Sequence, residues 1–240
     1  MKIENAVVLV TGANRGLGRA FAQAALARGA RKVYAAARDT ATLQDLPGVV
    51  PIRLDVTRAE DVARVAAECG DVTVLVNNAG IAHLGGFFAD DTIELAQRQL
   101  DTNYFGPLRM SRAFAPLLAA NGGGAILNVL SVASWLNGPL LGAYGVSKSA
   151  AWALTNGLRL ELAPQGTQVT GLHVGFVDTD LTRGLDVPKS LPADVVRAAF
   201  DGLEAGDAEV LADDISRMVK QGLSANPAIY VTGLPSSAAE

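Results

Sequence analysis

The chain has 240 residues, of which 50% are hydrophobic and 18% charged, and its formal net charge is −4. This composition fits one α/β domain with a buried sheet, and its high apolar content excludes a disordered chain. Lysines and arginines are scattered, so no basic stripe predicts binding to nucleic acid. One cysteine, Cys69, and two histidines leave neither an intrachain disulfide nor a structural zinc site, so we expect no metal.

The start of the chain and its apolar runs indicate where the protein works. Residues 1–6 are polar and include an acid, which does not fit a signal peptide. No uncharged run approaches the roughly 20 residues that a helix needs to cross a bilayer. We therefore expect a soluble, cytoplasmic protein that binds no membrane.

Seven apolar runs predict strands, and helical patterns lie between most of them. The predicted strands are Ala6–Val10, Lys32–Ala37, Val49–Leu54, Val72–Val76, Gly124–Val129, Gln168–His173 and Ala208–Leu211. The predicted helices are Arg19–Arg28, Arg58–Cys69, about Ile93–Ala120, about Ala143–Leu162 and about Asp213–Ser224. Strands joined by helices of this length form right-handed crossovers, so we expect a doubly wound, seven-stranded parallel sheet with helices on both faces, a Rossmann-like three-layer sandwich. Pro51 indicates that the third strand lies at an edge.

A glycine-rich turn follows the first strand. Gly12, Gly16 and Gly18 have the spacing G-x-x-x-G-x-G, which differs from the common G-x-G-x-x-G pattern. Glycines in such a turn let the backbone approach a pyrophosphate that lies at the N-terminus of the next helix. A turn that needs glycine only for its shape is the alternative, but the strand before it and the helix after it favour dinucleotide binding.

The end of the second strand indicates which nicotinamide dinucleotide is bound. Arg38 offers a planar donor fork that suits the 2′-phosphate of NADP, and Arg15 in the glycine turn can approach the same phosphate. Asp39 is the contrary observation, because a carboxylate there can accept hydrogen bonds from the ribose of NAD. We expect NADP(H) rather than NAD(H), with an NAD-preferring dehydrogenase as the alternative.

Two more loops follow strand ends on the same edge of the predicted sheet. Asp55 follows the third strand, where it can hydrogen-bond the adenine amino group. Asn77 and Asn78 follow the fourth strand and can tie neighbouring strand ends together, whereas Gly80 leaves room for the cofactor. The alternative for Asn77 is a turn residue that satisfies its own backbone.

Tyr144 and Lys148 are the candidate reaction centre. They are four residues apart on a predicted helix and therefore share one face. A phenol with a pKa near 10 is a poor acid or base at neutral pH, and an ammonium group one turn away stabilises its phenolate. Ser131 lies just past the fifth strand, where its hydroxyl can polarise a carbonyl oxygen that Tyr144 protonates.

Taken together, these residues resemble the short-chain dehydrogenase/reductase (SDR) family, in its compact single-domain branch. The segments that carry the resemblance are Thr11-Gly12-x-x-x-Gly16-x-Gly18, Asn77-Asn78-Ala79-Gly80, Asn103, Ser131 and Tyr144-x-x-x-Lys148, within about residues 5–180. The resemblance implies a hydride-transferring oxidoreductase and a catalytic tetrad. In it Tyr144 is the acid/base, Ser131 orients and polarises the substrate oxygen, Lys148 binds the nicotinamide ribose and lowers the Tyr144 pKa, and Asn103 holds a water that relays protons.

The resemblance and the turn chemistry together give a set of expected cofactor-binding residues. They are Gly12, Asn14, Arg15, Gly16, Leu17, Gly18, Arg38, Asp55, Val56, Asn78, Ala79, Gly80, Tyr144, Lys148, Gly175, Val177 and Thr179. One departure is Val174, which stands where the family commonly has the proline of a Pro-Gly pair, whereas Thr179 matches the residue expected to bond the carboxamide.

No linker divides the chain, so we expect residues 1–240 to form a single dinucleotide-binding and catalytic domain. The family resemblance implies a substrate lid at about 180–200, and the last residues, about 234–240, are expected to form a loose tail. The family also implies a homodimer or a homotetramer. The predicted helix after the last strand replaces the ending through which family tetramers often pack, so a dimer through the two long central helices is the alternative.

Mostly apolar residues follow strand ends on the catalytic side. The candidates for substrate contact are Ala82, His83, Trp135, Leu136, Leu141, Phe176 and Leu181. They predict a lipophilic ketone, aldehyde or secondary alcohol rather than a sugar phosphate or an acyl-CoA. His83 as an ordinary loop residue and Trp135 as a core residue are the alternatives.

Two other classes of protein reuse this fold. A dinucleotide-binding sensor or scaffold keeps the fold without turnover, but such proteins typically lose the tyrosine or the lysine, and both are present here. A lyase similar to the halohydrin dehalogenases keeps the Ser-Tyr pair but loses the glycine turn, which this chain retains. The sequence therefore favours the oxidoreductase.

Overall fold

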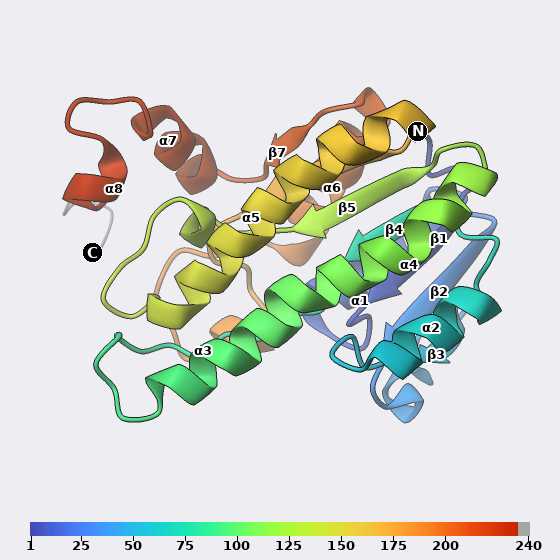
Figure 1. The fold of residues 1–240 in the computed structure, drawn as a ribbon, viewed down its shortest axis with the longest axis horizontal. Helices are drawn as coiled ribbons and strands as arrows, with labels where there is room; N and C mark the ends of the chain where they lie inside the picture. Colours follow the sequence, from blue (N-terminus) through green and yellow to red (C-terminus); the bar gives the residue numbers. More distant parts are fainter. Residues whose placement is uncertain (235–240) are drawn as a thin grey trace.

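Seven parallel strands form one sheet in the order β3-β2-β1-β4-β5-β6-β7 (Figure 1). The computed structural model describes residues 1–234, so the expected loose tail lies, apart from Leu234, outside the described residues. The strands are β1 (Val7–Thr11), β2 (Lys32–Ala37), β3 (Val50–Arg53), β4 (Val74–Asn77), β5 (Ala125–Val129), β6 (Gln168–His173) and β7 (Glu209–Leu211). The doubly wound sheet predicted from the sequence is confirmed, and Pro51 lies on edge strand β3.

Helices cover both faces of the sheet (Figure 1). They are α1 (Gly16–Ala27), α2 (Ala59–Glu68), α3 (Thr92–Leu100), α4 (Gly106–Ala120), α5 (Gly142–Leu162), α6 (Pro192–Ala205), α7 (Asp214–Gly222) and α8 (Ile229–Thr232). The single long helix predicted for about 93–120 is α3 and α4 joined by a π-helical turn, Asp101–Phe105. None of the helices within residues 1–234 is long and apolar enough to cross a membrane.

The alternation of side chains along each strand divides the core into two. On β1, Val8 and Val10 pack among residues of α1 and α6, whereas Val7 and Leu9 face the layer formed by α2, α4 and α5. All of these side chains are fully buried. Because both faces of the sheet are covered, its strands read as unbroken apolar runs in the sequence, which is why the strand ends were predicted to within two residues.

Helix α6 was not predicted, and it corrects the extent of the expected lid. Val195, Val196 and Ala199 are fully buried, and Phe200 packs edge-on against Phe21 of α1 with 5.3 Å between ring centroids. Helix α6 therefore packs into the core through one of its faces. Only the segment from about 180 to 191 is left for the predicted lid.

We expect Phe200→Ala to destabilise the fold by about 3–5 kcal/mol, because it empties a closely packed site between α1 and α6. Arg197→Ala is the matched control on the same helix, since among residues 1–234 the Arg197 side chain pairs only with exposed Asp194, and its effect should stay within about 0.5 kcal/mol. Urea unfolding followed by circular dichroism measures both. If Phe200→Ala lowers the free energy of unfolding by less than about 1 kcal/mol, Phe200 is not packed between α1 and α6 as described here.

Candidate active site

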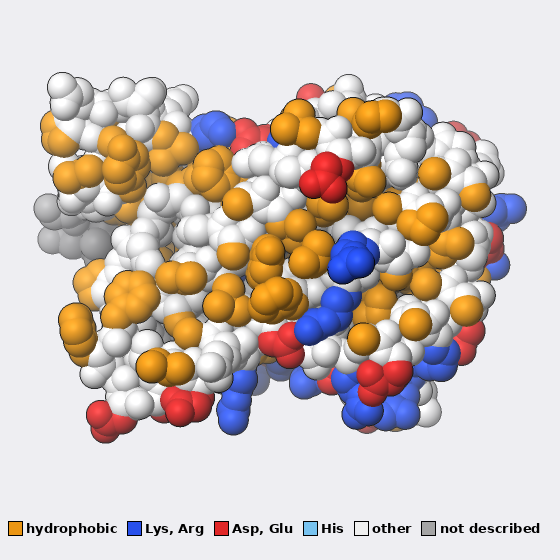
Figure 2. Space-filling view, in the orientation of Figure 1, with side chains coloured by type: hydrophobic (Ala, Val, Ile, Leu, Met, Phe, Trp, Pro, Cys, Tyr) orange, Lys and Arg blue, Asp and Glu red, His pale blue; other side chains and the backbone are white. Residues whose placement is uncertain are grey.

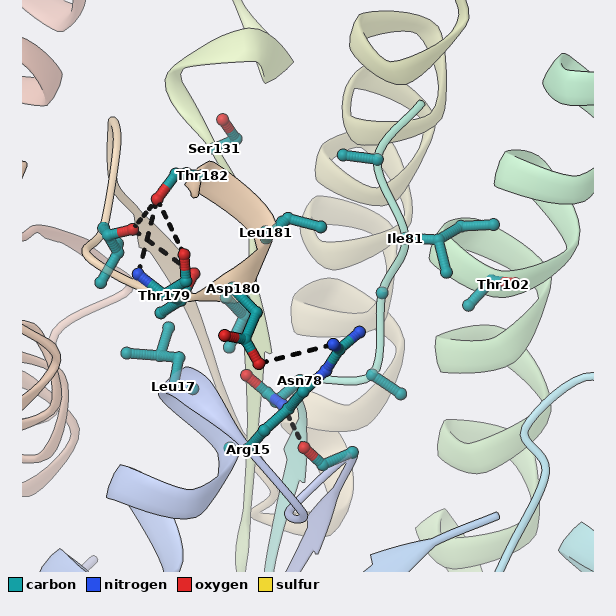
Figure 3. Close-up of a pocket in the computed structure, with 18 of the residues that line it drawn as sticks. Arg15, Leu17, Asn78, Ile81, Thr102, Ser131, Thr179, Asp180, Leu181 and Thr182 are labelled. Atoms are coloured by element: carbon teal, nitrogen blue, oxygen red, sulfur yellow. Dashed lines mark hydrogen bonds and ion pairs between the residues drawn. The ribbon is translucent and has the colours of Figure 1, made fainter. Parts of the chain in front are cut away.

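A cavity of about 650 Å³ opens at the carboxyl ends of the strands, where the order of the sheet reverses between β1 and β4 (Figure 3). Its volume is within the range typical of small-molecule and cofactor sites, and a crevice at this point is where doubly wound sheets bind ligands. Every residue that the sequence predicts to bind the cofactor lines this cavity, including the glycine turn, Arg38, Asn78 and Thr179.

The glycine turn forms one wall of the cavity. Gly12 and Gly16 have φ values of +66° and +52°, which residues with side chains rarely adopt. A Cβ atom on Gly18 would lie 2.1 Å from the carbonyl oxygen of Gly12, so α1 packs against the end of β1 too closely for any side chain. No side chain of the described residues caps the first turn of α1, which leaves its N–H groups for an anion. This cradle fits the pyrophosphate of a dinucleotide.

Hydrogen bonds fix the glycine turn against the end of β4. The Asn78 side chain donates to the carbonyl oxygens of Thr11 and Gly12 at 2.9 and 3.2 Å. The Thr11 hydroxyl accepts the N–H groups of Asn78 and Ala79, each at 3.0 Å. The sequence predicted a role for Asn78 but not for the Thr11 hydroxyl. The motif contains Thr11, but it does not show which groups the hydroxyl bonds.

The two residues that bear on coenzyme choice differ in what they contact. The Asp39 carboxylate accepts the N–H of Ala41 at 2.9 Å and caps the short helix Thr40–Leu43. Arg38 lines the cavity, and within residues 1–234 its side chain makes no hydrogen bond or ion pair. Burial raises the pKa of Asp55, but hydrogen bonds from Thr57 and the charge of Arg38 outweigh it and hold that pKa below its usual value.

Arg15 forms an ion pair at the edge of the glycine turn. Its guanidinium is 3.6 Å from the carboxylate of Asp180, which also pairs with Arg183 (Figure 3). Both arginines, Arg15 and Arg38, line the same cavity. The ion pair joins the glycine turn to the segment after β6, and a phosphate position shared by Arg15 and Arg38 stays a prediction.

The predicted reaction centre occupies the other end of the cavity. Tyr144 and Lys148 lie one turn apart on α5, with the Lys148 Nζ 5.9 Å from the centroid of the Tyr144 ring. The Lys148 ammonium donates to the carbonyl oxygen of Val129 at 2.9 Å, at the end of β5. Ser131 caps the short helix Val132–Ser134, and its hydroxyl accepts the N–H of Ala133 at 3.1 Å. All three side chains face the cavity.

Burial sets the protonation of this centre. It lowers the pKa of Lys148 to about 8. It also raises the pKa of Tyr144, and a hydrogen bond with Ser131 offsets only part of that shift. The sequence led us to expect that Lys148 lowers the pKa of Tyr144, but burial is the larger effect in this structure. The Tyr144 phenol therefore carries its proton at neutral pH.

Asn103 lies in the π-helical turn behind the cavity. Its amide donates to the carbonyl oxygen of Ile81 and to the Ser147 hydroxyl, both at 2.9 Å, and accepts the N–H of Ile81 at 2.9 Å. Both amide N–H bonds are therefore in use, and the side chain braces the loop after β4. Neither amide N–H bond is free to hold a water in this structure. The proton relay through a water stays a prediction.

The candidate substrate residues separate into two groups. Ala82, Leu141, Phe176 and Leu181 line the cavity. His83 does not line it. The sequence missed further lining residues, which no motif singles out: Ile81, Leu84, Thr102, Thr182 and Leu185.

Trp135 and Leu136 are corrected to core residues. Both are buried in a cluster with Val219 and Ile229 from the C-terminal helices. Trp135 stacks on His173 with 3.7 Å between ring centroids and 17° between ring planes. Their position after a strand end suggested the pocket, but α7 and α8 cover them.

Comparison with known proteins places the chain among dehydrogenases. A family model described as short chain dehydrogenase matches residues 6–189. The chain is 32% identical over 198 residues to Dehydrogenase/reductase SDR family member 7B of Bos taurus, which covers 75% of this chain. It is 35% identical over 210 residues, or 80% of this chain, to short chain dehydrogenase tazN of Aspergillus terreus. The chain spans 60% and 45% of the length of these two relatives.

A solved structure is similar over nearly the whole chain. It is that of a short chain dehydrogenase from Burkholderia cenocepacia J2315 in complex with NADP. The sequence identity is 40% and the TM-score 0.93, over 98% of this chain and 100% of that one.

The pKa of Lys148 can be measured without any ligand. We expect the ¹³Cε resonance of one lysine in the labelled protein to titrate with a midpoint at about 8, because burial disfavours the ammonium form. This titration should be missing from the spectra of Lys148→Met. If no lysine resonance of the wild type titrates below about pH 9, the burial of Lys148 described here is wrong.

Proposed function

Because the chain belongs to the short-chain dehydrogenase/reductase family of oxidoreductases, we propose that it is an NADP(H)-dependent carbonyl reductase or secondary alcohol dehydrogenase. The proposed substrate is a small, lipophilic ketone, aldehyde or alcohol. The observation that carries the proposal is that Ser131, Tyr144 and Lys148 surround one end of the cavity whose other wall is the glycine turn.

The side chains divide the proton chemistry between them. NADPH, when bound, supplies the hydride. The Ser131 hydroxyl polarises the carbonyl oxygen, and the Tyr144 phenol donates a proton to that oxygen as negative charge develops on it. The buried Lys148 ammonium then stabilises the phenolate, and in the direction of alcohol oxidation the same phenolate accepts the proton.

Apolar side chains support a lipophilic substrate. Leu141, Phe176, Leu181 and Leu185 line the cavity together with Ile81. The charged residues of the lining, among them Arg38, Asp39 and Asp55, belong to the predicted cofactor-binding wall, and Asp180 is paired with Arg15. Among the described residues Lys148 is the cation of the lining nearest Tyr144, and the proposed mechanism assigns its ammonium to the Tyr144 phenolate, not to a phosphate or carboxylate group of the substrate.

Tyr144→Phe is expected to lower kcat/KM for carbonyl reduction about 10²- to 10⁴-fold, because it removes the proton donor and keeps the ring. The Kd for NADPH should stay unchanged. Steady-state NADPH oxidation with a panel of lipophilic ketones, and titration of NADPH fluorescence, measure the two quantities. Tyr104→Phe is the control, since Tyr104 lies outside this cavity. Full activity in Tyr144→Phe would contradict the proposed mechanism.

Three observations support NADP(H) as the coenzyme. Arg38 faces the cavity without a partner among residues 1–234, so its guanidinium is available to a 2′-phosphate. The Asp39 carboxylate is already bonded to the Ala41 N–H, which reduces its capacity to hold an NAD ribose. The similar dehydrogenase from Burkholderia cenocepacia J2315 was solved with NADP.

We expect Arg38→Ala to lower kcat/KM with NADPH about 10- to 100-fold, because a charge-assisted hydrogen bond to the 2′-phosphate is lost. The kcat/KM with NADH should change less than about threefold. Arg31→Ala is the matched control, since Arg31 is exposed and immediately precedes β2, whereas Arg38 follows its other end. If the ratio of kcat/KM with NADPH to that with NADH is the same in Arg38→Ala as in the wild type, Arg38 does not bind the 2′-phosphate.

The proposal includes assembly into a homodimer or a homotetramer. Apolar side chains gather on the face of the molecule formed by α4 and α5 (Figure 2). A groove between these helices is lined on the α5 side by Ala150, Ala153 and Gly157, which are small enough to let a second helix approach closely. This face supports packing between copies through the two long helices.

A further inference from the structure

The carboxylate of Asp213 holds the loop after β6, which forms part of the cavity wall. Asp213 lies between β7 and α7, and its Oδ2 accepts the N–H of Gly175 at 2.7 Å. Its Oδ1 accepts the N–H of Ser216 at 2.9 Å and so caps α7. The Ser190 hydroxyl also donates to Oδ2, at 3.4 Å. Asp213 thus joins three segments that are distant in the sequence.

The loop that Asp213 holds is the one that follows β6. Val174, Gly175, Phe176 and Val177 line the cavity, whereas Asp213 does not. The loop is also bonded to Ser190, whose N–H donates to the Phe176 carbonyl oxygen at 2.8 Å. Because Asp213 bonds both Gly175 and Ser190, it fixes the loop and the strand-like segment that pairs with it.

The residues of this loop do little to fix its own shape. Val174 lacks the ring by which a proline fixes φ, and its carbonyl oxygen accepts the N–H of Val132 at 3.0 Å. Gly175 is the least restricted residue of all, and it is required here because a Cβ atom would lie 2.4 Å from the Cγ2 of Ile215 on α7. Contacts with other segments therefore set the position of the loop, and at Gly175 these contacts come from Asp213 and Ile215.

We propose that Asp213 is a positioning residue that places the loop after β6 against the nicotinamide half of the cofactor. The proposal rests on the proposed function, since it requires NADP(H) to bind in this cavity. Asp213 contacts neither cofactor nor substrate. It acts through the Gly175 N–H, and a carboxylate is a stronger acceptor for such a bond than a neutral oxygen.

Variants of α7 separate this role from helix capping. Asp213→Ser keeps a side chain that caps helices as well as aspartate does, but it is too short to reach Gly175. Asp213→Asn keeps the size of the side chain but has one acceptor oxygen in place of two, so it cannot accept the N–H groups of both Gly175 and Ser216 on separate oxygens. Ser216→Ala weakens the capping box and leaves the Gly175 bond intact. Asp214→Asn removes a neighbouring carboxylate that is fully exposed and, in the part of the chain that the structure describes, pairs only with Arg217.

The experiment compares the Kd of NADPH with that of 2′,5′-ADP, which lacks the nicotinamide half, by calorimetry on the full chain. For Asp213→Ser and Asp213→Asn we expect the Kd of NADPH to rise about tenfold and that of 2′,5′-ADP to stay within about twofold. Ser216→Ala and Asp214→Asn should bind both ligands as the wild type does. Thermal unfolding of the four variants reports their stability separately.

The possible failures are distinguishable. If the wild type binds both ligands and the Asp213 variants bind NADPH normally, or lose both ligands equally, Asp213 does not position the nicotinamide wall. The same conclusion follows if Ser216→Ala loses NADPH selectively, because capping then explains the effect. If the wild type binds neither ligand, the proposed function itself is wrong.

Discussion

The close approach of α1 to the end of β1 is the constraint on which the site depends. A side chain on Gly18 would collide with the backbone of Gly12, and the distance of 2.1 Å leaves no room for adjustment. This contact directs the N-terminus of α1 at the crevice, and Thr11 and Asn78 tie it to the end of β4. The pyrophosphate cradle and the switch point of the sheet therefore coincide, and the cavity opens where they meet.

Burial gives this cavity its chemical character. Lys148 is held by the carbonyl oxygen of Val129 in a place where its ammonium is poorly solvated, and its pKa falls to about 8. The same surroundings raise the pKa of Tyr144 and keep its phenol protonated. The pair is thus arranged to release a proton only when a nearby oxygen gains charge, which suits carbonyl reduction near neutral pH.

The sequence predicted the features that local pattern encodes. Unbroken apolar runs predict strands buried on both faces, and the spacing of Tyr144 and Lys148 places them on one helical face. Contacts between distant segments carry no such signal. The Asp213 carboxylate meets Gly175 from 38 residues away, and Trp135 follows a strand end like a pocket residue yet stacks on His173. Helix α6 was missed, so the expected lid extended too far.

Hydride transfer between NADPH and a carbonyl carbon is the step on which the proposed function depends. The most direct test supplies the protein with a lipophilic ketone and NADPH that carries deuterium at both positions of the nicotinamide C4. Mass spectrometry and NMR of the product then locate the label. The account predicts an alcohol with one deuterium on the former carbonyl carbon. An alcohol without the label, or no alcohol from any ketone of the panel although NADPH binds, would contradict it.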